Sequence, residues 1–455
     1  MDKLFSDFKS STAQDWKNQI VKDLKGVDFE KLIWRNANNN GFDINPFYTS
    51  EDIQTENKSL FTNPGWDICE QITVTNEEQA NVRALKALEG GASGLSFYIL
   101  KKIDTKALLK GISLEHIYTQ FFISNDALHV LDDLKDNYGK INPHDGKLKC
   151  FINIDPLSLF AFYGEWHADE TKDISVLKQL VHIPVNISLY QEAGANTITE
   201  LACGLSHANE YFNYLSNQKA LKDKTLHFIF SIGSDFYTEI AKLRAFKKLL
   251  AMLQEEYNTH FETHIHAQTS QQNKSNLDSY NNMLRTTTEA MSAIIGGCNS
   301  LCVLPYDETF SEASEFSSRI ARNQQHILKE ESYLHHTADM AAGSYYIETL
   351  TDEIAAKVWD EFKNIESKGG FIACLKSNYI QDTIKQQADV LIQQFKEEKT
   401  VLVGVNKYQN AKEQLAVSNK PLVNSASKSL SAKGSQLITP IKPICLSDYL
   451  VKENA

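Results

Sequence analysis

The 455-residue sequence has no long apolar run and no cluster of basic residues. No stretch approaches about 18 consecutive apolar residues, and the N-terminus has no cationic patch followed by an apolar segment, so we expect a cytoplasmic protein that does not cross a membrane. No run of Lys or Arg exceeds two residues, and 46 basic against 58 acidic residues give a formal charge of −12. Such a chain repels phosphate backbones, which disfavours nucleic acid as a partner.

Paired cysteine motifs are also missing. A disulfide framework or a structural zinc site would show paired spacing, so the pattern indicates free thiols in a reducing compartment. The sequence also lacks GxxxxGK[ST], GxSxG and HExxH, so it offers no phosphate-binding loop, hydrolase elbow or zinc-protease helix. The seven cysteines stand at 69, 150, 203, 298, 302, 374 and 445, without any CxxC.

From Asp67 onward, short β-branched and aromatic runs alternate with longer amphipathic stretches. This rhythm is typical of repeated βα units, and eight repeats predict an α/β fold, a (β/α)8 TIM barrel. Predicted helices over Glu77–Leu88 and Tyr280–Ile295 end at glycine pairs, which can close a helix in the left-handed conformation. The predicted strands are Asp67–Val74, Gly94–Leu100, Gln120–Ser124, Lys149–Ile154, Pro184–Leu189, Leu226–Ile232, Phe261–Gln268 and Ser300–Pro305.

The two ends of the chain differ from this core. Residues 1–60 form an N-terminal arm with a helix over Thr12–Lys25, capped by Ser11 or Thr12. An apolar stripe along it would pack on the barrel or on a partner subunit. The stripe consists of Trp16, Ile20 and Leu24.

Residues 61–408 hold the barrel and its terminal additions, and residues 409–455 read as an extended tail rich in Ser, Lys and Pro. After the last strand of the barrel the pattern predicts a helix over Glu312–Glu331. A second helix should start near Thr351, with Asp352 and Glu353 in its first turn, and a further strand should span 400–406.

Polar residues on the seventh strand mark the candidate site. His264, His266 and Gln268 share one face because strand side chains repeat every two positions. If that face points inward, the three line a polar pocket, and if it points outward they pack against helices. An HxH pair also suits a metal ion, for which the additional ligands would be Asp155, Glu165 and Asp307.

Long motifs resemble the methylmalonyl-CoA mutase family over essentially the whole chain. The family's barrel binds acyl-CoA, and a separate flavodoxin-like domain at its C-terminus binds adenosylcobalamin. Together they interconvert succinyl-CoA and methylmalonyl-CoA by a radical rearrangement. The motifs are YNNMLRTTTEAMSAIIGGCNSL at 280–301, SSRIARNQQHILKEES at 317–332, ADMAAGSYYIETLTDEIAAKVWDEFKNIESKGGF at 338–371 and VGVNKY at 403–408.

The chain departs from the catalytic pattern of that family at four places. The cobalt-ligating D-x-H-x-x-G motif is absent, and the tail after Tyr408 is shorter than a cobalamin domain requires. A segment like TMYxxRPWTIRQYAG, which carries a catalytic Tyr and Arg, is replaced by NPGWDICEQI at 63–72. The pattern GYHMQEAGA becomes LYQEAGA at 189–195, which loses the His, and the Arg-x-Thr-Tyr segment becomes DPLSLFAFYGEW at 155–166.

With these motifs lost, the chain resembles the small (beta) subunit of heterodimeric bacterial mutases. The resemblance implies a non-catalytic chain that pairs with a large (alpha) catalytic subunit. It further implies that the partner holds adenosylcobalamin and contacts the arm. It implies no catalytic and no metal-binding residue here, with His266, Gln268 and Tyr190 as substrate contacts.

Two other readings stay open. One is a catalytic barrel of the isobutyryl-CoA mutase type, whose cobalamin domain is a separate chain. The other is a metal-dependent hydrolase that uses His264 and His266.

Overall fold

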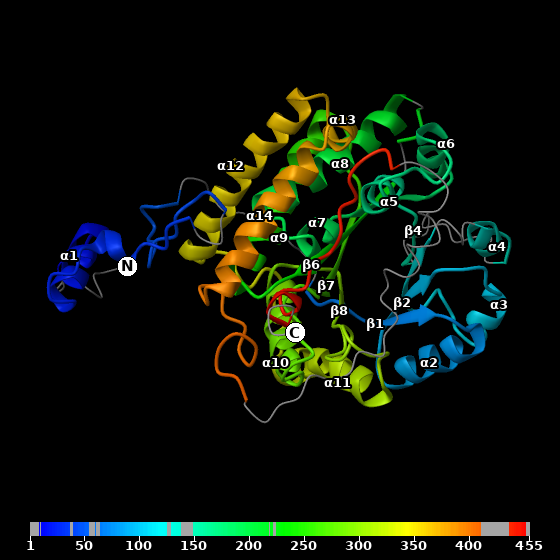
Figure 1. Cartoon of the computed structure of the whole chain (residues 1–455), viewed down its shortest axis with the longest axis horizontal. Helices are drawn as coiled ribbons and strands as arrows, with labels where there is room; N and C mark the ends of the chain where they lie inside the picture. Colours follow the sequence, from blue (N-terminus) through cyan, green and yellow to red (C-terminus); the bar gives the residue numbers. More distant parts are fainter. Residues whose placement is uncertain are drawn as a thin grey trace, which may run out of the picture.

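A computed structural model of the chain describes residues 9, 11–36, 40–53, 60, 64–124, 129–137, 149–217, 219–221, 224–410 and 436–451. Eight strands form one sheet in the order β4-β3-β2-β1-β8-β7-β6-β5, and every paired neighbour is parallel. The predicted (β/α)8 barrel is confirmed (Figure 1). Its strands are β1 Asp67–Val74, β2 Gly94–Ile99, β3 Tyr118–Ile123, β4 Cys150–Asn153, β5 His182–Asn186, β6 Thr225–Ile232, β7 Thr263–Thr269 and β8 Ser300–Cys302.

Helices surround the sheet, and caps fix several of their starts. The side chain of Asn76 accepts from Gln79 N at the start of α2, and that of Asp155 accepts from Ser158 N at the start of α5. The barrel helices are α2 Glu77–Glu89, α3 Thr105–Leu108, α4 His129–Asn137, α5 Pro156–Tyr163, α6 Glu170–Ser175, α7 Ser188–Glu192, α8 Thr197–Asn217, α9 Phe236–Glu256, α10 Asn281–Ile295 and α11 Glu315–His326.

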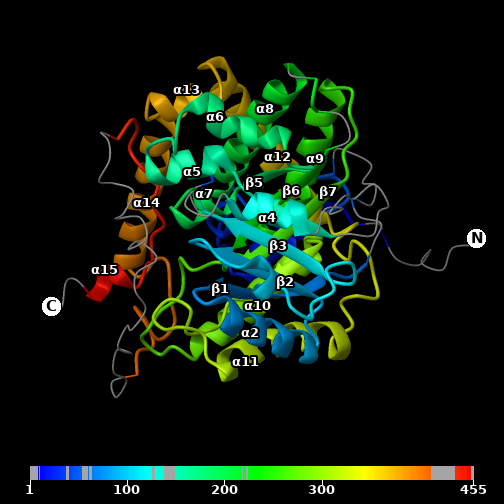
Figure 2. The same cartoon turned by 90° about the vertical axis from the view of Figure 1, so that its right-hand side faces the viewer.

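Further helices follow the barrel: α12 Tyr345–Ser367, α13 Phe371–Lys376, α14 Tyr379–Lys396 and α15 Asp448–Val451. Figure 2 shows α14 and α15 along one side of the barrel. Among the described residues, every helix is too short or too polar to cross a lipid bilayer.

The predicted start of one helix and one predicted strand were wrong. The helix expected to start near Thr351 is α12, which begins six residues earlier, so that Thr351 is a buried interior residue and Asp352 pairs with Lys248 at 2.6 Å. Asp352 and Glu353 suggested the first turn of a helix because acidic residues are common there, but the buried residues of α12 already begin at Ile347. Residues 400–406 form a turn with an isolated bridge from Val403 to Lys407, because Leu402 and Val405 pack on α14 instead of pairing in the sheet.

The N-terminal arm carries α1 (Ala13–Asp23), and Thr12 and Asp15 cap it reciprocally. No residue of α1 is buried, Trp16 is 55% exposed and Leu24 is 43% exposed. The Trp16 ring meets Phe47 edge-on, with centroids 6.1 Å apart. The helix projects away from the barrel (Figure 1), so its apolar stripe does not pack on the barrel helices.

The described part of the tail is ordered against the barrel. Residues 439–445 form no helix, strand or turn, in keeping with the predicted extended tail, and Ile438, Ile441 and Leu446 are buried; residues 448–451 depart from that prediction and form the short helix α15. Residues 411–435 and 452–455 of the predicted tail lie outside the described residues.

The barrel has one seam. Strands β4 and β5 share no backbone ladder, although they are neighbours in space. Pro184 in β5 has no N–H to donate, which is typical of an edge strand. Side chains cross the seam instead: His182 Nε2 lies 2.8 Å from Ile152 N and 2.9 Å from Ile152 O, and Asn186 N donates to Asp155 Oδ2 at 2.7 Å.

Replacement of His182 by Phe tests this seam. The ring volume is nearly kept, but the buried backbone of Ile152 loses its hydrogen-bond partner, so we expect a loss of about 1–3 kcal/mol in the free energy of unfolding, measured by urea denaturation. His260→Phe, at an exposed position, is the control and should stay within about 0.5 kcal/mol of wild type. Equal stability of the two variants would remove His182 from the seam.

Candidate functional site in the barrel lumen

The seventh strand turns its polar face into the barrel. Ile265 and Ala267 pack outward in the main apolar core, while His264, His266 and Gln268 point into the lumen. The register places His227 of β6 beside His264. The predicted common face is therefore present and faces inward.

Aromatic rings fill the lumen near the N-terminal ends of the strands. Tyr118 stacks on His264 with centroids 4.8 Å apart, and Phe151 stacks on His227 at 4.2 Å. Opposite Tyr118, a Cβ on Gly94 would lie 3.0 Å from the tyrosine ring and 2.7 Å from Cys69 Sγ. Only glycine leaves room for the tyrosine ring, so this level of the lumen is closed by side chains.

Above the rings, hydrogen bonds order the polar side chains in one direction. Asn153 Oδ1 can only accept, so His227 carries its proton on Nδ1, 2.8 Å away, and its bare Nε2 faces the Tyr118 hydroxyl at 2.9 Å, which also lies 3.0 Å from Gln120 Oε1. Asn153 Nδ2 donates to Gln120 Oε1 at 3.2 Å. Gln120 Nε2 in turn donates to His266 Nε2 at 2.9 Å.

The chain of bonds continues to β8. His266 Nδ1 donates to Ser300 Oγ at 2.8 Å, and the Ser300 hydroxyl donates to His264 Nε2 at 3.0 Å. Gln120 Nε2 also donates to Ser96 Oγ at 2.5 Å. These polar side chains of the lumen therefore take their hydrogen-bond partners from one another.

Burial keeps these imidazoles neutral. It lowers the pKa of His266 to about 3 and that of His182, at the seam, to about 4. The pKa values of His227 and His264 also fall well below the ordinary range, first through burial and then through the neighbouring imidazoles. The chain of hydrogen bonds requires neutral imidazoles, because each ring must donate from one nitrogen and accept at the other.

Gln268 lies at the C-terminal rim, where β/α barrels carry their sites. Its Nε2 donates to Ser231 Oγ at 3.3 Å, and Tyr98 donates to its Oε1 at 3.4 Å. Ser231 donates to Glu192 at 2.7 Å, and Gln271 N donates to the same carboxylate at 3.0 Å. Burial raises the pKa of Glu192.

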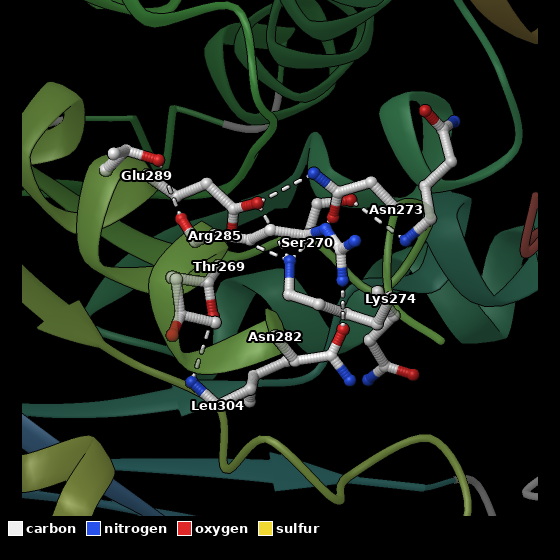
Figure 3. A network of polar contacts seen from close by, with 12 residues as sticks. Thr269, Ser270, Asn273, Lys274, Asn282, Arg285, Glu289 and Leu304 are labelled. Carbon is white, nitrogen blue, oxygen red and sulfur yellow. Dashed lines mark hydrogen bonds and ion pairs between the residues drawn. The ribbon is translucent and has the colours of Figure 1, made fainter. Parts of the chain in front are cut away.

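The loop after β7 is anchored by a buried ion pair that sequence reasoning missed. Lys274 Nζ lies 2.8 Å from both carboxylate oxygens of Glu289 on α10 (Figure 3). Asn273 Nδ2 donates to the same carboxylate at 2.7 Å. The two charges are fifteen residues apart, a spacing that indicates no pairing, so the sequence carried no usable signal beyond the family motif itself.

Tyr190 lies apart from the other two predicted substrate contacts. Its hydroxyl is 2.9 Å from His207 Nδ1 on α8, and its ring packs edge-on against Phe371 of α13. The structure therefore brings His266 and Gln268 together on β7, but it places Tyr190 between α7, α8 and α13. Its predicted role in substrate binding stays a prediction.

The acidic residues considered as metal ligands have other surroundings. Asp155 Oδ1 accepts from Tyr211 at 2.5 Å and lies 3.0 Å from His207 Nε2. Over the part of the chain that the structure describes, no three His, Cys, Asp or Glu side chains are grouped as a metal site requires. The pair His264 and His266 has Ser300, not a carboxylate, between its nitrogens.

Comparison with known proteins places these observations in a family. A family profile described as methylmalonyl-CoA mutase matches residues 97–433. The chain is 34% identical to the methylmalonyl-CoA mutase small subunit of Porphyromonas gingivalis, over 90% of this chain and 71% of that protein.

Two further relatives are similar at lower identity. They are the methylmalonyl-CoA mutase of Rhizobium meliloti, 27% identical over 89% of this chain and 65% of the relative, and the methylmalonyl-CoA mutase small subunit of Streptomyces virginiae, 28% identical over 84% and 68%. The chain thus spans about two thirds of the length of these relatives.

The neutral lumen predicts a pH dependence that one variant isolates. The pKa of His266 is about 3 in the folded chain against 6.5 as its ordinary value, so the unfolded chain binds more protons below pH 6.5 and stability falls as the pH falls. Between pH 7 and pH 5 the wild type should lose about 2 kcal/mol relative to His266→Gln, which cannot titrate. Urea denaturation at both pH values measures this, and a pH-independent difference would contradict it.

Proposed function

This chain belongs to the methylmalonyl-CoA mutase family, and we propose that it is the small, non-catalytic subunit of an adenosylcobalamin-dependent methylmalonyl-CoA mutase. The proposed complex is a heterodimer in which a large subunit interconverts succinyl-CoA and methylmalonyl-CoA. Two of the relatives named above are themselves called small subunits, which supports this assignment.

The self-satisfied lumen carries the proposal. A ligand on the barrel axis would have to displace the stacked Tyr118 and Phe151 rings and break the bonds that Gln120, His227 and His266 make with their neighbours. Buried polar groups left unpaired cost about 1–3 kcal/mol each, so several broken bonds would consume the affinity of an ordinary ligand. A lumen of this kind supports a structural role better than a catalytic one.

The departures from the catalytic motifs point in the same direction. Where the catalytic pattern has an anion-binding Arg-x-Thr-Tyr segment, this chain has α5, whose buried apolar residues include Leu157 and Phe160. Where the pattern has a His on the fifth strand, the chain proceeds from Leu189 to Tyr190 within α7. Neither segment contains Lys, Arg or His, the side chains that would hold a carboxylate by charge or polarise a thioester.

The residues present do not fit a cobalamin site. No D-x-H-x-x-G motif occurs in the sequence, and the histidines of the barrel are engaged elsewhere: His227, His264 and His266 with lumen side chains, and His207 with Asp155. We therefore propose that adenosylcobalamin binds to the large subunit, and we derive no chemical step through the cofactor in this chain.

The arm is the proposed contact with the large subunit. Trp16 and Leu24 expose apolar surface on a helix that projects away from the barrel (Figure 1), and aromatic residues are enriched at subunit interfaces. In a cytoplasmic protein, a partner that covers such a stripe removes apolar surface from water, which stabilises the complex.

The proposed substrate contacts remain His266, Gln268 and Tyr190. Their exposure differs, and it indicates which of them a ligand could reach. His266 and Tyr190 are at most 1% exposed, whereas Gln268 is partly exposed at the rim. We therefore propose that Gln268 makes any direct contact with an acyl-CoA, while His266 and Tyr190 hold the structure around it.

The purified chain should show no mutase turnover of succinyl-CoA when adenosylcobalamin is supplied, because the catalytic donors are absent. Addition of the large subunit should give turnover, measured as methylmalonyl-CoA by chromatography. The same assay decides against a catalytic barrel served by a separate cobalamin domain: turnover after addition of a free cobalamin-binding domain alone would show that this chain is catalytic.

Substitution of Trp16 by Ala should weaken binding to the large subunit by about tenfold or more, since a buried aromatic anchor contributes about 2 kcal/mol. Biolayer interferometry at concentrations near the dissociation constant measures the change. Tyr333→Ala, a similarly exposed aromatic on the barrel, serves as the matched control. Unchanged affinity of the Trp16 variant would exclude the arm from the interface.

A further inference from the structure

The extended segment 437–447 crosses the C-terminal face of the barrel and contacts both sides of the seam. On the β4 side, Ile438 N donates to Gly164 O at 3.2 Å and Ile441 N donates to Ala161 O at 2.8 Å. On the β5 side, Ile444 N donates to Glu192 O at 2.8 Å. The segment, coloured red in Figure 1, therefore spans the place where the sheet has no ladder.

Its far end reaches the loop after β7. Leu446 N donates to Gln272 O at 2.9 Å, and the hydroxyl of Ser447 donates to Lys274 O at 3.1 Å. Lys274 is itself fixed by Glu289, so the segment ends on an anchored loop. One stretch of chain thus joins α5 after β4, α7 after β5 and the loop after β7.

Apolar anchors hold the segment down. Ile438 and Ile441 are 4% exposed and belong to the main core, and Leu446 is 3% exposed and packs with Phe395 and Leu402. Leu437, in the same stretch, is 63% exposed. Buried side chains recur at Ile438, Ile441 and Leu446, so the segment is anchored to the barrel along its whole length.

Two glycines beneath the segment leave space for it. Gly164 has φ +82°, and a Cβ there would lie 2.7 Å from Ile438 O. Gly194 has φ +101°, and a Cβ there would lie 3.1 Å from Ile444 Cδ1 and 2.6 Å from Ala388 Cβ. Both positions need glycine for their backbone conformation, and both are in close contact with the segment.

We propose that residues 437–447 act as a strap that holds the barrel closed over its unpaired β4/β5 seam, so that release of the strap opens the lumen to solvent and ligands. The strap replaces the missing ladder between β4 and β5 with contacts from a third segment. It also crosses part of the face at which β/α barrels receive ligands.

Two lumen cysteines report on this opening. Cys69 and Cys302 lie on adjacent strands and pack with Tyr118 and Phe151 inside the barrel, and both are at most 3% exposed. Cys203, on α8, is equally buried but belongs to the core outside the lumen. All three are free thiols, so alkylation by iodoacetamide followed by mass spectrometry gives a rate for each.

The test compares Ile438→Asn/Ile441→Asn, which unseats the strap, with Leu437→Asn, which changes an exposed position of the same strap. In the full chain, the double variant should alkylate Cys69 and Cys302 at least tenfold faster than wild type, with Cys203 unchanged. Leu437→Asn should match wild type. Equal acceleration at Cys203, or no acceleration at the lumen cysteines, would overturn the proposal.

A milder variant keeps the proposal testable if the double variant does not fold. In Ile441→Ala, hydrogen exchange of the β4 amides should accelerate relative to that of the β1 amides, because β1 is paired on both sides and β4 on one. A constant ratio of the two exchange rates would refute the strap.

Discussion

The carboxylate of Asp155 links the elements on the two sides of the β4/β5 seam. It caps α5 through Ser158 N, accepts from Asn186 N across the seam and takes bonds from Tyr211 and His207 on α8. Burial alone would raise its pKa, but His207 and these donors lower it, so the group stays charged inside the protein. One charge thus holds a strand end, two helices and the neighbouring strand in place.

The lumen and the seam form one system. The rings of Phe151 and His182 meet edge-on, with centroids 5.2 Å apart, so the side chain that bridges β4 and β5 also packs against the filling of the lumen. Packing inside the barrel and closure of its wall therefore support each other. This coupling explains how a barrel without a complete ladder keeps neutral imidazoles in its interior.

The sequence predicted the repeated strands and helices of the barrel better than the irregular segments that follow it. Period and length place all eight strands, and β1 has the predicted bounds, because alternation records which face is buried. The start of α12 and the turn at 400–406 depend on packing against other elements, which local pattern does not contain. For the site, the period of two put His264, His266 and Gln268 on one face, but Tyr118, Gln120 and His227 join them only through the register of distant strands.

The directed chain of hydrogen bonds in the lumen also limits how the sequence can change over evolution. Each member from Tyr118 to His264 supplies the donor or acceptor that the next one needs, so a single replacement leaves an unpaired neighbour in a buried place. Several replacements together would therefore be needed to empty the lumen without leaving buried polar groups unpaired. Because each lumen side chain needs the hydrogen-bonding group of its neighbour, these positions can change only together.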